Sequence, residues 1–170
     1  MAYISKIDLS TAPQEVRAAV DNHLAQGYQL TNEKLTLLHN VTAFHTLEEG
    51  SYELDRELQR LIGKRAADFY EYAISLQNDC LVCSAYFSRL LEKNYIDFAT
   101  FDFTDDERLL IEYGRAIARD PKHVPEDLMH LMQQTFTEEQ LVVITTMGIF
   151  MIANNYFNDI LKVDPAPVQE

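Results

Sequence analysis

The spacing of apolar residues along this chain predicts a structure built almost entirely of helices. Apolar positions recur every three or four residues, as they do on one face of a helix, and the alternation typical of strands is almost absent. Thr104 and Thr137 each begin a capping box, and Gly27 and Gly63 mark two junctions. We predict about eight helical segments, over residues 14–26, 31–40, 41–62 with a break near 49–51, 64–76, 80–93, 105–119, 125–135 and 138–161.

The last predicted helix is apolar on nearly every side. In a soluble protein such a helix either runs through the core or is buried between subunits. Its longest apolar stretch, residues 141–153, is shorter than the roughly 20 residues that cross a bilayer, and it is interrupted by Thr145, Thr146 and Gly148. We therefore expect a homo-oligomer that does not span a membrane.

Composition and charge narrow the class of protein. Hydrophobic residues make up 47% of the 170 residues, with only five Gly and five Pro, which indicates one globular domain with its own core. The net charge of −13 argues against binding to nucleic acid or to an anionic membrane, because phosphates would be repelled. The first ten residues lack the apolar stretch of a signal peptide, so we expect a cytoplasmic protein. No Gly-rich phosphate-binding loop or dinucleotide fingerprint occurs, and we expect no cofactor.

The candidate chemistry lies at the two cysteines of the chain, Cys80 and Cys83. We expect Asn78 or Asp79 to cap a helix that begins at Cys80. A helix N-terminus stabilises a thiolate, and side chains three residues apart share a face, so the two sulfurs can meet. One thiolate could then attack a substrate and the other thiol could resolve the product, although Asp79 and the acidic background oppose a nearby anion.

Two other interpretations of the cysteine pair can be weighed from the sequence. Structural zinc needs two further ligands, but no second pair of cysteines exists, so we expect no metal. Two buried thiols that pack as small hydrophobic groups remain an alternative. A transient redox disulfide is compatible with a reducing cytoplasm, whereas a structural one would be unusual.

From residue 66 onward the sequence resembles the carboxymuconolactone decarboxylase superfamily, in particular its alkylhydroperoxidase (AhpD)-like branch. The pattern of that branch is an acidic residue, eleven intervening positions and then C-x-x-C-x-x-x-H, and Asp68, Cys80 and Cys83 follow this spacing. Three later segments resemble the branch in the same order: residues 104–121, 136–142 and 154–158. The resemblance covers roughly residues 30–163 of a single domain, 1–170, and leaves 1–30 as an N-terminal helical extension.

The resemblance implies an all-α, AhpD-like helical bundle that assembles as a trimer or hexamer, or as a dimer. It implies that the two cysteines cycle between dithiol and disulfide, with Cys83 attacking a peroxide and Cys80 resolving. Asp68 takes the place of the acidic residue that, together with a histidine, activates the thiol. Electrons would come from a thiol donor or be passed to a partner peroxiredoxin.

Two positions depart from the pattern of the branch. The relay histidine is replaced by Phe87, which cannot move a proton. Asp68 stands where the branch usually has the longer Glu, and Glu71, three residues on, could point the same way. Tyr86 is a candidate substitute for the histidine, although a buried aromatic residue is the simpler interpretation.

We therefore predict a thiol-dependent oxidoreductase that reduces peroxides or a partner disulfide. Two alternatives stay open. A non-catalytic or redox-sensing oligomer would have kept the fold and lost the chemistry, as Phe87 suggests. A lyase like the carboxymuconolactone decarboxylases proper would act on a lactone, but few basic residues lie near the motif to bind its carboxylate.

Overall fold

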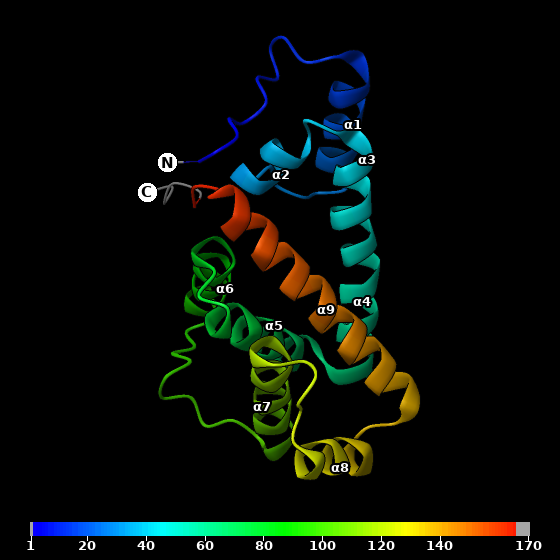
Figure 1. Ribbon diagram of the computed structural model, residues 1–170, viewed down its shortest axis with the longest axis vertical. Helices are drawn as coiled ribbons and strands as arrows, with labels where there is room; N and C mark the ends of the chain where they lie inside the picture. Colours follow the sequence, from blue (N-terminus) through cyan, green and yellow to red (C-terminus); the bar gives the residue numbers. More distant parts are fainter. Residues whose placement is uncertain (1, 166–170) are drawn as a thin grey trace.

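In a computed structural model, which describes residues 2–165, helices follow one another along the chain from residue 14 to residue 161 (Figure 1). They are α1 (Gln14–Ala25), α2 (Asn32–Leu37), α3 (Val41–Phe44), a π-helical segment η1 (His45–Glu49), α4 (Gly50–Ile62), α5 (Lys64–Gln77), α6 (Leu81–Lys93), α7 (Asp105–Arg119), α8 (Glu126–Thr135) and α9 (Glu138–Leu161). No strand occurs in this part of the chain. The predicted all-α class is confirmed.

The predicted break near residues 49–51 is wrong. Because α3, η1 and α4 run on without interruption, the helices form eight separate segments, as the sequence predicts. Gly50 keeps a helical backbone, with φ −62° and ψ −37°. The helix widens into a π turn at this point instead of ending, and π turns inside helices are often found at functional sites.

Two capping boxes fix where α7 and α9 begin. The hydroxyl of Thr104 accepts from the N–H of Glu107, whose carboxylate accepts from the N–H of Thr104 in return. Thr137 and Gln140 make the same reciprocal pair at the start of α9. Both helix starts were predicted from these residues, and each cap contributes about 1 kcal/mol.

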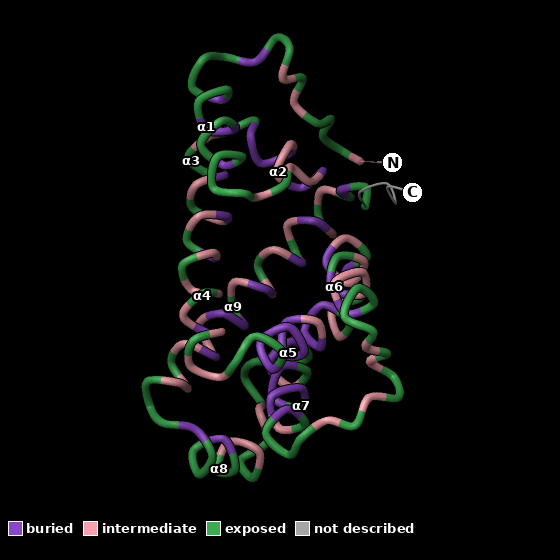
Figure 2. The backbone as a smooth tube through the Cα atoms, turned by 180° about the vertical axis from the view of Figure 1, so that it is seen from behind, coloured by how far each residue is buried: buried purple, intermediate pink, exposed green. Residues whose placement is uncertain are grey.

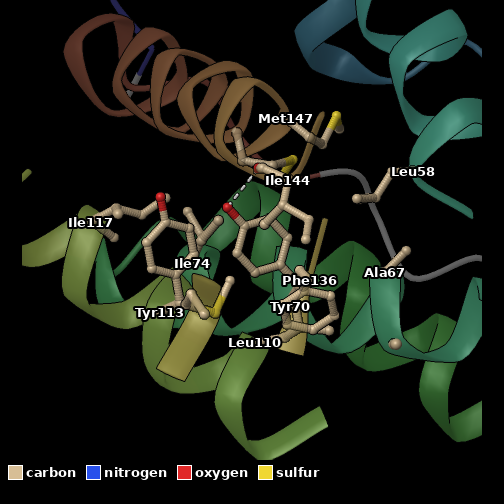
Figure 3. Packing of buried hydrophobic residues seen from close by; sticks show 14 of the residues in the cluster. Leu58, Ala67, Tyr70, Ile74, Leu110, Tyr113, Ile117, Phe136, Ile144 and Met147 are labelled. Atoms are coloured by element: carbon tan, nitrogen blue, oxygen red, sulfur yellow. Dashed lines mark hydrogen bonds between the residues drawn. The ribbon is translucent and has the colours of Figure 1, made fainter. Parts of the chain in front are cut away.

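Helix α5 lies at the centre of the molecule. Figure 2 shows it as the most continuously buried helix, and it packs against α4, α6, α7 and α9. Its Tyr70 is fully buried and donates a hydrogen bond from its hydroxyl to the Ile144 carbonyl of α9 at 2.8 Å (Figure 3). The main hydrophobic cluster of the described residues surrounds this tyrosine.

The N-terminal helices form a second, smaller cluster that is tied to the end of α9. Val16, Leu38 and Phe44 belong to this cluster. The N–H of Tyr3 donates to the carbonyl of Leu161 at 2.9 Å, so the beginning and the end of the described chain meet (Figure 1).

Helix α9 is longer than the apolar stretch that argued against a membrane span. At 24 residues it is the one helix within residues 2–165 that is long and apolar enough to cross a membrane, judged by length and composition alone. The length argument therefore does not hold for the whole helix. Core helices of soluble proteins pass the same test, and α9 packs against α4, α5, α6, α7 and α8. Absence of a membrane span stays a prediction.

Candidate functional site

The two cysteines lie at the tight turn that joins α5 to α6. Asn78 is the C-cap of α5, and Asp79 adopts the left-handed region with φ 54°. The N–H of Cys80 donates to the carbonyl of Ser75 at 3.1 Å. The N–H of Asp79 donates to the carbonyl of Leu76 at 3.2 Å, which completes a Schellman motif. Asn78 and Asp79 therefore end α5 and do not cap α6, so the predicted cap is wrong and Cys80 itself is the N-cap residue.

The pKa of the Cys80 thiol is lowered to about 7 by hydrogen bonds at the start of α6. The first cause is a hydrogen bond from the Cys83 side chain, and the N–H groups of Cys83 and Val82 act in the same direction. These N–H groups have no partner within the helix, because they belong to its first turn. The Cys80 side chain makes no capping hydrogen bond, so these N–H groups act by stabilising negative charge on its sulfur. Burial and Asp159 oppose them.

The environment of Cys83 favours the protonated thiol. Its pKa is raised, first by the hydrogen bond to Cys80 and then by burial and by the Glu33 carboxyl. The Asn158 amide donates to its sulfur at 3.4 Å. Both cysteines are buried and neither is in a disulfide. The pair therefore shares a proton, with the negative charge favoured on Cys80, whereas the resemblance implies that Cys83 attacks; that assignment stays a prediction.

The surroundings of the cysteines are polar. Neither cysteine belongs to a hydrophobic cluster of the described residues. Three buried polar side chains gather here or on the adjoining turn of α9: Glu33, Asn155 and Asn158. Two cysteines that served only for packing would be expected among apolar neighbours.

Asp68, predicted to support the thiol, is paired with a lysine. Lys64, one turn earlier on α5, contacts both carboxylate oxygens of Asp68 at 2.8 Å. Burial raises the pKa of Asp68. In residues 2–165 no hydrogen bond joins Asp68 to either cysteine, and its role stays a prediction. Glu71 is buried nearby, with its pKa raised by burial and then by Asp55.

The aromatic residues that follow the cysteines on α6 have separate positions. Phe87 is only 5% exposed and belongs to the main hydrophobic cluster. Tyr86 is 53% exposed, so its interpretation as a buried aromatic residue is wrong. Its ring packs edge-on against Phe87, with centroids 5.1 Å apart. Phe87 therefore acts as a core residue at the position of the relay histidine.

The carboxyl group that acts on the cysteines is one that the sequence did not predict. Glu33 comes from α2, 47 positions before Cys80, and no motif links the two. The one local signal is that Glu33 lies four residues before the buried Leu37, which places it on the apolar face of a short helix.

Within the described chain no group of three or more His, Cys, Asp or Glu side chains is arranged to hold a metal ion. Among the described residues no hydrogen bond joins a histidine to either cysteine. His123 pairs with Asp120 at 2.7 Å on the surface, and the buried His23 packs against aromatic rings of the N-terminal cluster.

A solved structure shares this fold. The crystal structure of an alkylhydroperoxidase AhpD core, an uncharacterized peroxidase-related protein from Ralstonia eutropha JMP134, matches 98% of this chain and 93% of its own length. The TM-score is 0.72 and the sequences are 18% identical. No protein-family model and no curated protein matches the sequence. The chain thus has the AhpD-like helical fold, as the resemblance implies.

Proposed function

We propose that this protein is a thiol-dependent oxidoreductase that reduces peroxides, or a disulfide of a partner, by cycling Cys80 and Cys83 between dithiol and disulfide. The observation that carries the proposal is the position of Cys80 as the N-cap of α6 with a second free thiol, Cys83, one turn away, an arrangement that lowers the pKa of Cys80 to about 7. A thiol with this pKa is about half ionised at neutral pH, and the thiolate is the nucleophile. The AhpD-like fold of the solved neighbour supports the same chemistry.

The reaction runs in three balanced steps. The Cys80 thiolate attacks one peroxide oxygen, an S–O bond forms as the O–O bond breaks, and the other oxygen leaves with a proton as an alcohol or water. The Cys83 thiol then attacks the sulfenic acid, a disulfide forms and water leaves. A dithiol donor reduces the disulfide by exchange and becomes oxidised itself.

Sulfenic-acid trapping in single variants tests the proposal. We expect Cys83→Ser to form a sulfenic acid on Cys80 when hydrogen peroxide and dimedone are added, detected by mass spectrometry. Cys80→Ser should trap little dimedone, because Cys83 stays protonated, and neither variant should turn over with a dithiol donor.

The matched variants also separate the alternatives. Trapping on Cys83 in Cys80→Ser, with none on Cys80 in Cys83→Ser, would establish the order of attack that the resemblance implies. Undiminished turnover in Cys83→Ser would rule out the dithiol mechanism. A disulfide that forms without turnover would favour a redox sensor.

A further inference from the structure

Helix α2 is held against the C-terminal end of α9, next to the cysteines. The Asn32 amide donates to the carbonyl of Asp164 at 2.9 Å and to that of Pro165 at 3.2 Å. The N–H of Val163 donates to the carbonyl of Asn158. These bonds join α2 to the residues that follow α9, and Val163 among them is bonded back to the backbone of Asn158; Figure 1 shows α2 beside this end of α9. The residue after Asn32 is Glu33.

Glu33 is a buried carboxyl group whose charge acts on the cysteine pair. It is 9% exposed, and its Oε1 atom has no hydrogen-bond partner. The Asn158 amide donates to the Cys83 sulfur at 3.4 Å, and the same side chain lowers the pKa of the Glu33 carboxyl. Glu33 and the two cysteines also act on one another electrostatically. A buried carboxyl without a partner is costly, and such groups are often kept for function.

A chain of polar groups leads from Glu33 toward the surface. Glu48, buried in the π-helical segment η1, acts on Glu33. Glu48 accepts a hydrogen bond from the hydroxyl of Tyr52 at 2.5 Å and lies 3.6 Å from the ammonium of Lys34. Tyr52 is partly exposed and stacks on Tyr28. The π turn thus brings a second carboxyl group between the site and solvent.

We propose that Glu33 is the group that exchanges protons with the Cys80–Cys83 pair during peroxide reduction, with Asn158 holding it in position. The inference rests on the proposed function. It assigns to a residue of the N-terminal segment the proton transfer that Phe87 cannot perform.

The proton balance closes over one cycle. Protonated Glu33 supplies the proton that the leaving oxygen takes when the Cys80 thiolate is oxidised, and it becomes a carboxylate. When the sulfenic acid condenses, the proton of Cys83 leaves with the hydroxide as water. Reduction of the disulfide by a dithiol donor restores one thiol and one thiolate and releases one proton, which returns Glu33 to its acid form.

The charge state of Glu33 agrees with this role. Its pKa is raised to about 8, first by burial and then by Glu48, while Asn158 and Lys34 act in the opposite direction. Cys80 raises it further. Glu33 therefore holds a proton at neutral pH, where the Cys80 thiol is already partly ionised, so acid and nucleophile are present together.

Glu33→Gln, Glu33→Asp and Glu15→Gln test the inference together. Glu15 is the matched control, because it too is the second residue of a helix but is exposed. Two rates are measured from pH 5 to 10 in the full-length protein: oxidation of the thiols by hydrogen peroxide in a single turnover, and alkylation by iodoacetamide, which needs no proton donor.

We expect Glu33→Gln to slow peroxide oxidation at pH 7 by about 100-fold, the usual contribution of a general acid. Alkylation should not slow, because removing a carboxyl group near the sulfurs favours the thiolate. The wild-type alkylation profile should rise in two coupled steps, near pH 7 and 8, and that of Glu33→Gln in one. Glu33→Asp should recover part of the peroxide rate, and Glu15→Gln should match the wild type.

Each other outcome overturns the inference in a recognisable way. Peroxide oxidation in Glu33→Gln at the rate of Glu15→Gln would show that Glu33 transfers no proton. An equal loss of both rates in Glu33→Gln would assign Glu33 a structural role only. No oxidation by peroxide in the wild type and in Glu15→Gln would overturn peroxide reduction as the proposed function, and this inference with it.

Discussion

At Cys80 the position of one residue in a helix sets its chemistry. As the N-cap of α6 it lies where a Ser or Asp side chain would accept hydrogen bonds from the first turn, and the sulfur receives the same stabilisation as an anion. Cys83, three residues on, is held as a thiol by Cys80, by burial and by Glu33. The same motif thus contains one thiol with a lowered pKa and one that keeps its proton.

The cysteine pair could be predicted from the sequence, but its polar partners could not. The spacing of Cys80 and Cys83 is visible in the chain, whereas Glu33 reaches them only because α2 is held on the end of α9. Asp68 has the spacing of the branch but meets Lys64, which lies one helical turn away and competes for its charge. The packing of α2 against the end of α9, which is distant in the sequence, therefore determines which carboxyl group acts on the thiols.

Restoring the histidine of the branch is expected to destabilise this protein. Phe87 is buried in the main cluster, with the Tyr72 ring 6.2 Å away, so Phe87→His would bury an imidazole without a designed partner. We expect the free energy of unfolding to fall by about 3 kcal/mol, with no gain in peroxide reduction. Urea denaturation measures this loss. Phe87→Leu is the apolar control, and its free energy of unfolding should fall by less. A gain in peroxide reduction at unchanged stability would contradict the account.

Two helices approach α5 closely because they carry glycine where they meet Tyr70. A Cβ atom on Gly114 of α7 would lie 3.0 Å from the tyrosine ring. One on Gly148 of α9 would lie 2.2 Å from the tyrosine hydroxyl and 2.5 Å from Ile117. The sequence predicted these helices and their caps. Gly148 was interpreted only as an interruption of an apolar stretch, whereas in the structure it is the position where α9 packs closely against Tyr70.

Gly148→Ala is therefore expected to weaken the contact between α5 and α9. The new methyl group must displace Tyr70 or α9 and break the hydrogen bond to Ile144, which should cost about 3 kcal/mol of unfolding free energy. Gly50→Ala is the control, because its Cβ would lie 3.7 Å from the Phe150 ring, an ordinary contact in a helix, and it should stabilise slightly. Equal urea midpoints for the two variants would refute this account of the packing.

At the scale of the molecule, the exposed side of α9 stands out. Val142, Ile149, Tyr156 and Ile160 are each more than half exposed and lie seven, seven and four residues apart, which places them along one side of the helix. A stripe of this kind is typical of helices that pack against a second copy. It is the physical basis on which we expect a homo-oligomer.

Ile149→Glu tests that expectation. We expect the wild-type protein to sediment as a species larger than its 19.6 kDa chain, and the variant to shift toward the monomer, because the new charge would be buried at the contact. Leu131→Glu is the control, because Leu131 is a half-exposed apolar residue on α8, away from the stripe. A monomeric wild type would refute the expectation.

A redox titration of the folded protein shows whether Cys80 and Cys83 form a working dithiol. The protein is equilibrated in dithiothreitol buffers of graded potential at several pH values, and free thiols are trapped and counted by mass spectrometry. The account predicts a reversible intramolecular disulfide and a thiol that titrates near pH 7. Two thiols that stay unmodified and unpaired until the protein unfolds would contradict it and identify them as packing residues.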